Sequence, residues 1–286
     1  MTRPFMSRRD FKNKTVVITG GASGIGLATA KEFARAGANI AMVDMDAAAL
    51  ERESRALDAE GVPVLPISCD VTDSAACEEA VAQILDCFGS LDLLFNNAGI
   101  TQRGLFEITA VQVIETVMAV NFFGAVYMTK AALPYLTAAR GAIIVNESIA
   151  GVAPLLGRCG YAASKHALHG FFTSLRCELR HKGVHVMIVC PGFIQTNLQT
   201  RALGGDGRIA THEQTRIGKQ QTPEFVGGQI RKGAEQNRPM LVFTLFGKLG
   251  YLIFRLCPAL YERMMTRQFR SELGSSDSRN LNHEKH

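Results

Sequence analysis

Short apolar runs rich in β-branched residues alternate with longer mixed segments along most of this chain. Such runs, here of four to seven residues, predict buried strands, and the amphipathic segments between them predict helices. The predicted strands are 15–19, 39–43, 62–68, 91–95, 142–145 and 184–189, and the predicted helices are 27–36, 74–88, 111–136 and one that contains Tyr161 and ends near 182. This alternation predicts an α/β fold with a Rossmann-type, doubly wound parallel sheet in three layers, whose ligands bind at the carboxyl ends of the strands.

The segments outside this alternation surround one predicted domain, residues 14–239. Residues 1–13 are basic and are predicted to form a solvated tail, and residues 271–286 are predicted to form a polar disordered tail. Residues 197–221 are polar and lack a clear periodicity, which predicts a mobile flap over the site.

Residues 240–270 carry apolar residues along one helical face and basic residues on another. Lys248, Arg255 and Pro258 interrupt the stretch, so it is not apolar enough to span a bilayer. We therefore expect a C-terminal apolar and basic helical extension. A lid on the substrate pocket or a subunit contact is favoured over a peripheral contact with an anionic membrane, which the same pattern also fits.

Composition narrows the class of protein. The chain has 286 residues, 47% of them apolar, and seven cysteines without a Cys-x-x-Cys pair, which favours neither a disulfide framework nor a zinc site. We expect reduced thiols, no bound metal and a cytoplasmic protein with or without membrane attachment, because the N-terminus lacks the apolar core of a signal peptide. The net charge of +5 comes from the C-terminal region, where aromatic residues do not alternate with the bases, so nucleic acid is not an expected partner.

A glycine-rich turn joins the first predicted strand to the first helix. In it, Gly20 permits a tight turn, Gly24 lets the backbone approach a pyrophosphate, and Gly26 lets the helix pack closely on the strand. The start of the helix faces the phosphates. Such a glycine trio alone is often a mere turn, but its place between a strand and a helix predicts a dinucleotide site that also includes Ser23 and Ile25.

Other predicted cofactor contacts follow the later strands. Asp44 ends the second strand eighteen residues after Gly26, where a carboxylate can accept both ribose hydroxyls, although it could instead cap the next helix. Asp70 can reach an adenine amino group or cap a helix. Because Asp44 would repel a 2′-phosphate, we expect NAD in preference to NADP. The remaining predicted contacts are Val71, Asn97, Ala98, Gly99, Pro191, Gly192, Ile194 and Thr196.

A phenol and an ammonium, Tyr161 and Lys165, lie four residues apart and therefore on one face of a helix. A fixed cation beside a tyrosine favours the phenolate and lowers the pKa of the phenol toward neutrality. Ser148 follows a buried strand, where its hydroxyl can hold a substrate oxygen against the phenol. The pair alone also fits an ordinary surface helix, and Asn121, inside an apolar helix, fits a hydrogen-bonded core residue.

Taken together, these residues resemble the short-chain dehydrogenase/reductase family over residues 14–239. The resemblance implies that Tyr161 is the general acid/base, that Ser148 positions the substrate oxygen, and that Lys165 holds the nicotinamide ribose and lowers the tyrosine pKa. It also implies that Asn121 orients a water that links Lys165 to solvent. The motifs that carry it are Thr19-Gly20-x-x-x-Gly24-x-Gly26, Asn96-Asn97-Ala98-Gly99, Asn121, Ser148 with Tyr161-x-x-x-Lys165, and Pro191-Gly192.

The activity implied is an NAD(P)-dependent interconversion of a secondary alcohol and a ketone. Phe193, Ile194 and Leu198 predict an apolar pocket and hence a hydrophobic substrate. The alternative is a catalytically silent cofactor sensor or scaffold on the same fold. A homo-oligomer is expected, but the chain lacks the glycine-rich last strand common in tetrameric members, which puts the usual tetramer contact in doubt. Glu147, where a small residue is common, is expected to point away from the site and is given no role.

Overall fold

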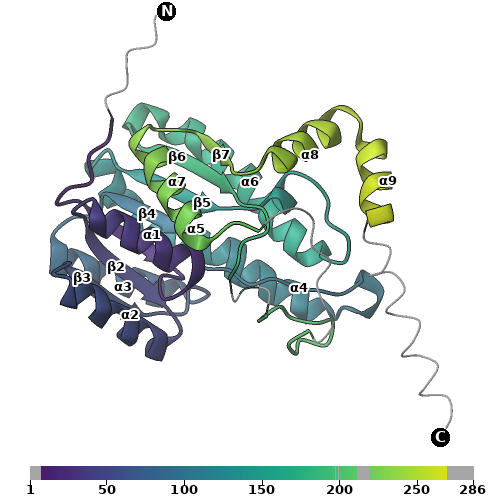
Figure 1. Cartoon of the computed structure of the whole chain (residues 1–286). Coiled ribbons are helices and arrows are strands. Elements are labelled where there is room, and N and C mark those ends of the chain that lie inside the picture. The colour runs from purple at the N-terminus through teal and green to yellow at the C-terminus, as the bar shows by residue number, and fades with distance from the viewer. Residues whose placement is uncertain (1–7, 197, 199, 211–219, 269–286) are drawn as a thin grey trace, which may run out of the picture.

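The computed structural model describes residues 8–196, 198, 200–210 and 220–268. A parallel sheet forms the middle layer, with helices on both faces (Figure 1). Its strand order is β3-β2-β1-β4-β5-β6-β7, which confirms the doubly wound α/β fold. The strands are β1 Thr15–Thr19, β2 Asn39–Asp44, β3 Val64–Ser68, β4 Leu93–Asn96, β5 Ala142–Asn146, β6 His185–Cys190 and β7 Met240–Val242. Because β7 pairs with β6, the sheet extends three residues beyond the domain boundary expected from the sequence.

Alternate residues of β1 face opposite layers. Val16 and Ile18 pack with residues of α1, α2 and α7, whereas Val17 packs with residues of α3, α5 and α6. Both faces of the sheet are therefore covered, and the residues of β1, β4, β5 and β6 are almost all buried. The helices are α1 Gly24–Arg35, α2 Ala47–Ala59, α3 Ser74–Phe88, α4 Val111–Met118, α5 Gly124–Ala138, α6 Cys159–Leu179, α7 Pro223–Glu235, α8 Leu245–Leu256 and α9 Pro258–Gln268. Short 3₁₀ turns lie at η1 Phe106–Ile108, η3 Ile149–Gly151 and η4 Arg180–Lys182.

The long helix predicted at 111–136 is interrupted. A π-helical segment, η2 Ala119–Phe123, separates α4 from α5 and contains Asn121. Such segments occur mostly as single turns inside α-helices, frequently at functional sites. Within the described residues, Val111–Ala138 is the one helical run long and apolar enough to cross a membrane, by length and composition alone. Here α5 packs on the sheet and on α3, and α4 packs on α6.

Of the predicted solvated N-terminal tail, residues 1–7 lie outside the described part, and residues 8–13 contact the domain although most of them are exposed. Phe11 is buried, and its ring meets Phe33 edge-on with centroids 4.8 Å apart. The backbone N–H of Arg9 donates to the Glu235 carbonyl at 2.8 Å, and Arg8 forms an ion pair with the Glu235 carboxylate. The basic residues thus tie the start of the chain to the end of α7.

The described part of the predicted flap is held to the segment after β4. The N–H of Leu203 donates to the Thr101 carbonyl at 2.9 Å, and the N–H of Arg103 donates to the Leu203 carbonyl at 2.7 Å. Ala202 is fully buried. Residues 197, 199 and 211–219 of the predicted flap lie outside the described residues.

The C-terminal extension consists of α8 and α9, which project from the edge of the body in Figure 1. The Thr244 hydroxyl caps α8 by accepting from the Gly247 N–H at 3.0 Å, and Phe254 meets Tyr261 edge-on, with centroids 5.5 Å apart, where the two helices turn. The outer faces expose the large apolar side chains of Leu249, Leu252, Leu256, Leu260 and Met264. The predicted tail at 271–286 lies outside the described residues.

Candidate active site

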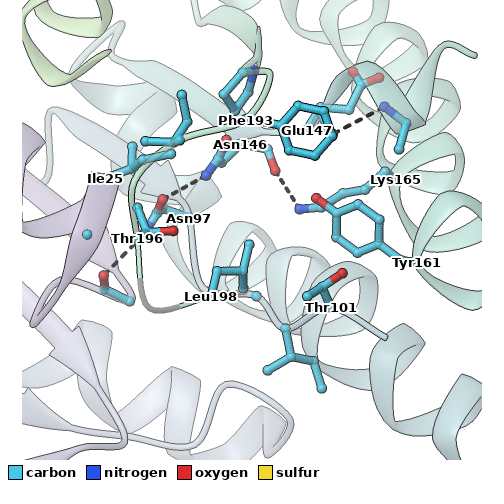
Figure 2. A pocket seen from close by; sticks show the side chains of 18 of the residues that line it. Ile25, Asn97, Thr101, Asn146, Glu147, Tyr161, Lys165, Phe193, Thr196 and Leu198 are labelled. Atoms are coloured by element: carbon cyan, nitrogen blue, oxygen red, sulfur yellow. Dashed lines mark hydrogen bonds between the residues drawn. The ribbon is translucent and has the colours of Figure 1, made fainter. Parts of the chain in front are cut away.

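A cavity of about 790 Å³ opens at the carboxyl ends of the strands, around the point between β1 and β4 where the strand order reverses. Of the predicted cofactor residues, all but Gly26 line it, and of the predicted catalytic residues, all but Asn121 do. Figure 2 shows this cavity between the start of α1, the strand ends and α6.

Glycines at two positions of the first turn are required by the backbone. Gly20 and Gly24 have φ values of 63° and 53°, the left-handed region that favours glycine. A Cβ at Gly26 would lie 2.0 Å from the Gly20 carbonyl oxygen, so this glycine serves helix packing and does not face the cavity. The turn and the start of α1 line the cavity, where the first N–H groups of an α-helix have no partner within the helix.

Two carboxylates stand at the β2 end of the cavity. The Asp44 carboxylate accepts from the Ala22 N–H at 3.0 Å and from the Asp46 N–H at 3.1 Å. The cap of α2 is Asp46, which accepts from the Ala49 N–H at 3.1 Å. Asp44 is therefore not the residue that caps α2. Arg201 also lines the cavity, with its Nη2 3.6 Å from Asp46 Oδ2. This cation was missed because Arg201 is far from Asp46 in sequence and follows no motif.

Asp70 and Val71 line the cavity at the end of β3. Asp70 accepts from the Thr72 N–H at 2.9 Å and from its hydroxyl at 2.8 Å. The cap of α3 is Asp73, which accepts from the Ala75 N–H at 2.8 Å. Asp70 therefore shapes a local turn beside the cavity.

A chain of hydrogen bonds joins the glycine turn to Lys165, as Figure 2 shows. Asn97 donates from Nδ2 to the Thr19 carbonyl at 3.0 Å and to the Gly20 carbonyl at 3.1 Å. Asn146 donates to Asn97 Oδ1 at 2.8 Å, and Lys165 Nζ donates to the Asn146 carbonyl at 2.7 Å. Asn146 was missed because it is simply the last residue of a predicted buried strand.

Tyr161 and Lys165 lie on the same face of α6, with Lys165 Nζ 5.6 Å from the centre of the Tyr161 ring. The Ser148 side chain lies beside the Tyr161 phenol and lowers its pKa, against the effect of burial. Ser148 Oγ also accepts from the Ala150 N–H at 3.1 Å, which fixes the serine at the start of η3. The three side chains predicted to act together thus meet in one buried corner of the cavity.

Burial dominates the electrostatics of this corner. It raises the pKa of Tyr161, while the Ser148 hydroxyl and the charge of Arg158 favour the phenolate. It also lowers the pKa of Lys165 to about 8, against the opposing charge of Glu147. The net direction for Tyr161 is thus opposite to that expected. Arg158, 2% exposed and donating to the Gln102 carbonyl at 3.1 Å, was missed because a lone arginine three residues before a tyrosine forms no recognisable pattern.

Asn121 lies behind the cavity. Its Oδ1 accepts from the Ile100 N–H at 2.8 Å, and its Nδ2 donates to the Ile100 carbonyl at 3.0 Å and to Ser164 Oγ at 2.9 Å. A Cβ at Gly99 would lie 3.1 Å from Asn121 Oδ1 and 3.7 Å from Lys165 Nζ. Asn121 therefore fixes the segment after β4 against α6, and Gly99 leaves the space between the amide and the lysine free.

The sequence matches the model of the short chain dehydrogenase family over residues 14–204. The chain belongs to the short-chain dehydrogenase/reductase family. Members of this family are oxidoreductases that act on CH–OH groups with NAD(P). The chain is 34% identical over 280 residues to dehydrogenase/reductase SDR family member 7B of Rattus norvegicus, an alignment that covers 95% of this chain and 86% of that protein. It is 33% identical over 267 residues to dehydrogenase/reductase SDR family protein 7-like of Drosophila melanogaster, with 91% and 82% covered.

Solved structures of short-chain dehydrogenases/reductases share the fold. One from Burkholderia phymatum in complex with NAD superposes with a TM-score of 0.77 at 24% identity and covers 87% of this chain and 96% of its own. An alcohol dehydrogenase from the archaeon Thermococcus sibiricus, complexed with 5-hydroxy-NADP, gives a TM-score of 0.67 at 25% identity and covers 76% and 88%. Both nicotinamide cofactors thus occur among proteins similar to this chain.

Proposed function

We propose that this protein interconverts a secondary alcohol and a ketone on a hydrophobic substrate, with NAD as the cofactor and Tyr161 as the general acid/base. The observation that carries the proposal is the buried Tyr161 side chain, which lines the cavity together with Ser148 and has Lys165 Nζ 5.6 Å from its ring centre. A catalytically silent sensor would need the dinucleotide cleft but not this group of three side chains.

The cavity fits a nicotinamide dinucleotide. The turn from Gly20 to Gly24 and the start of α1 would hold the pyrophosphate, because they line the cavity and the N-terminus of a helix favours an anion. Asp44 would accept the adenosine ribose hydroxyls, and Lys165 would donate to the nicotinamide ribose. When bound, the nicotinamide gives or takes a hydride, while the protein positions the substrate and moves the proton.

NAD is proposed over NADP because two carboxylates, Asp44 and Asp46, stand where a 2′-phosphate would lie. Arg201 supplies one cation there, but its side chain is 63% exposed and already faces Asp46. The local balance of one positive and two negative charges disfavours a further anion.

The proton step uses the corner between β5 and α6. Ser148 would hold the substrate oxygen, and Tyr161 would take the hydroxyl proton in oxidation and return it in reduction. A charged Lys165 favours the phenolate that forms. Asn121 would place a water near Lys165 by fixing the Ile100 backbone.

The part of the cavity beyond Ser148 is apolar, which favours a hydrophobic substrate. Leucine, proline, phenylalanine and methionine side chains line it, contributed by Pro154, Leu155, Phe193, Leu198, Phe243 and Met265. The Tyr261 hydroxyl of α9 donates to the Pro154 carbonyl at 3.3 Å, and a Cβ at Gly247 of α8 would lie 2.7 Å from Ile149 Cδ1. These contacts support a lid role for α8 and α9.

The outer face of α8 does not line the cavity. It exposes Leu249, Leu252 and Leu256 beside Lys248 and Arg255. We propose that this face forms a subunit contact in a homo-oligomer. Flotation with anionic liposomes and sizing by light scattering separate the two candidates. Oligomers that remain in the soluble fraction support the subunit contact, and monomers that float with the lipid contradict it.

The direct test of the proposed function is Tyr161→Phe, which removes the hydroxyl that takes and returns the proton but keeps the ring. NADH binding, followed by fluorescence, should be retained, and oxidation of a panel of alicyclic, steroidal and acyl alcohols with NAD should be abolished. Retention of more than about a few per cent of wild-type turnover would show that Tyr161 is not the general acid/base. A preference for small polyols would contradict the hydrophobic substrate.

A further inference from the structure

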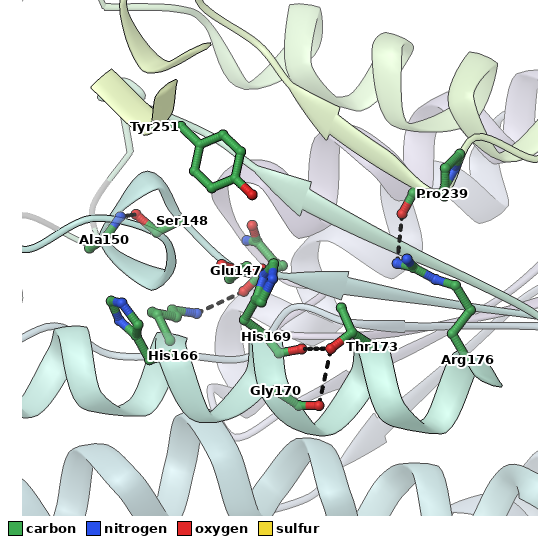
Figure 3. Close-up of polar contacts among 12 residues, drawn as sticks. Glu147, Ser148, Ala150, His166, His169, Gly170, Thr173, Arg176, Pro239 and Tyr251 are labelled. Carbon is green, nitrogen blue, oxygen red and sulfur yellow. Dashed lines mark hydrogen bonds and ion pairs between the residues drawn. The ribbon is translucent and has the colours of Figure 1, made fainter. Parts of the chain in front are cut away.

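Glu147 is a buried carboxylate in the middle of the catalytic corner. It lies between Asn146, whose carbonyl accepts from Lys165, and Ser148, and it lines the cavity. Its side chain is 0% exposed, and its Oε2 lies 3.0 Å from His169 Nδ1 (Figure 3). The expectation that Glu147 points away from the site is therefore not met.

The spacing along α6 explains how this contact arises. Tyr161, Lys165 and His169 follow each other at intervals of four residues, so they lie on one face of the helix. Glu147 packs against this face from the end of β5, and the His169 side chain, 30% exposed, is the part of the pair that meets solvent. A phenol, an ammonium and an imidazole thus lie along one face of the helix, and the Glu147 carboxylate contacts the imidazole.

The fold reserves space for this carboxylate. A Cβ at Gly151 would lie 2.3 Å from Glu147 Oε1, so only a glycine in the turn after Ser148 leaves room for it. The Glu147 backbone N–H donates to the Val189 carbonyl at 2.9 Å, which fixes the residue beside β6. A merely tolerated carboxylate would not need both a glycine opposite it and a histidine partner.

The surrounding charges determine what the pair does. Burial raises the pKa of Glu147, and the His169 hydrogen bond, together with the charges of His169, Lys165 and His166, opposes it. The Cys190 thiol, at the end of β6, also faces the carboxylate. The hydrogen bond to Glu147 raises the pKa of His169, while Arg176 of α6 and Arg255 of α8 lower it. Tyr251 of α8 stands over the pair in Figure 3 and accepts from Arg255 at 2.8 Å.

We propose that Glu147, held ionised by His169, is the counter-charge that keeps the Lys165 ammonium protonated in its buried site. Both residues act on the reaction through Lys165, so they are positioning residues. This inference rests on the proposed function, because it concerns the lysine that would hold the nicotinamide ribose and support Tyr161.

The test is the pH dependence of NADH binding by the full chain, which needs no turnover. Loss of the ammonium at high pH should weaken NADH binding, with a midpoint near the Lys165 pKa of about 8. Removing the counter-charge with Glu147→Gln should move this midpoint down by about one pH unit, because the neutral amine is then favoured. Glu147→Asp keeps the charge, so its midpoint should lie close to that of the wild type.

His169→Gln tests the second half of the pair without altering a fully buried residue. It should shift the midpoint in the same direction, and the double variant with Glu147→Gln should shift it no further than Glu147→Gln alone. His181→Gln, an exposed histidine in η4, is the matched control and should leave the midpoint unchanged. Equal midpoints for wild type and Glu147→Gln, or for wild type and His169→Gln, would overturn the inference.

The two proposals fail in distinguishable ways. Turnover retained by Tyr161→Phe, with the midpoint shift still present, would remove the proposed proton chemistry and leave the Glu147 counter-charge standing. A wild type that binds no NADH at any pH would overturn both.

Discussion

The Asn146 side chain donates a hydrogen bond of 2.8 Å to Asn97 Oδ1. The Asn146 carbonyl accepts from Lys165, and the Asn97 amide donates to the glycine turn at Gly20, so this bond connects the lysine to the turn. Asn146 is the last residue of β5, and Asn97 directly follows the adjacent strand β4. The position of the lysine and that of the phosphate-facing turn are therefore set by one contact.

Replacing Asn146 with alanine should loosen both ends of the cofactor site. Loss of the bond leaves the partly buried Asn97 Oδ1 without its donor, which costs about 1 kcal/mol in the free energy of unfolding. The KM for NAD should also rise several-fold. Denaturant unfolding and steady-state kinetics measure the two effects, with Asn39→Ala on β2, outside the cavity, as the control. An unchanged KM would show that the contact is not needed for cofactor binding.

Asp44→Asn should narrow the preference for NAD, because it keeps the shape of the side chain and removes its charge. We expect the ratio of the NADP dissociation constant to that of NAD to fall roughly tenfold. Adding Arg201→Ala should reverse part of this gain, because Arg201 then no longer attracts the 2′-phosphate. The exposed Asp58→Asn on α2 is the control. A ratio that Asp44→Asn leaves unchanged would contradict the charge argument.

Two glycines in helices make a matched pair. Gly26→Ala should destabilise the fold by about 2 kcal/mol or more, because its Cβ would lie 2.0 Å from the Gly20 carbonyl oxygen. Gly170→Ala in α6 meets no atom within 4 Å and should stabilise it by roughly 0.5–1 kcal/mol through helix propensity. Thermal unfolding should therefore shift in opposite directions for the two variants, and shifts of the same sign would contradict the packing assigned to Gly26.

Lys165 should make the free energy of unfolding depend on pH in alkaline solution. Its pKa is about 8 in the folded chain, below the ordinary value of 10.5, because burial disfavours the ammonium. Between these values the unfolded state binds more protons, so stability rises with pH relative to a chain without this group. The difference in unfolding free energy between wild type and Lys165→Met should thus change in favour of wild type from about pH 8 to about pH 10.5. A constant difference would contradict this burial effect.

The sheet was predictable because buried parallel strands are continuous apolar runs, and each of the six expected runs is a strand. Helix α7 was not predicted, since Gly227 and Gly233 weaken its helical pattern. A Cβ at Gly233 would lie 2.6 Å from Leu241 Cδ1, so tertiary packing requires the residue that the local signal disfavours. The strand β7 is only three residues long and was hidden in the apolar extension.

The candidate site divides in the same way. Residues that follow strands within motifs, such as Asp44 and Ser148, were found because parallel strand ends converge on one edge. Arg158, Arg201 and the Glu147–His169 pair were missed because their significance depends on contacts between segments far apart in sequence. Burial also reversed the expected direction for the Tyr161 pKa, and no pattern of neighbouring residues indicates how deeply a phenol will be enclosed.

The packing of α7 on α1 has a consequence for synthesis of the chain. A Cβ at Gly227 would lie 2.9 Å from the Ala28 carbonyl, so the two helices are in close contact although about 200 residues separate them. At a translation rate of about 5–20 residues per second, α7 is synthesised roughly 10–40 s after α1. The apolar side of α1 stays uncovered for that time. During that interval the nascent chain exposes a surface suited to a chaperone, and a ribosome that stalls before α7 would release a product prone to aggregation.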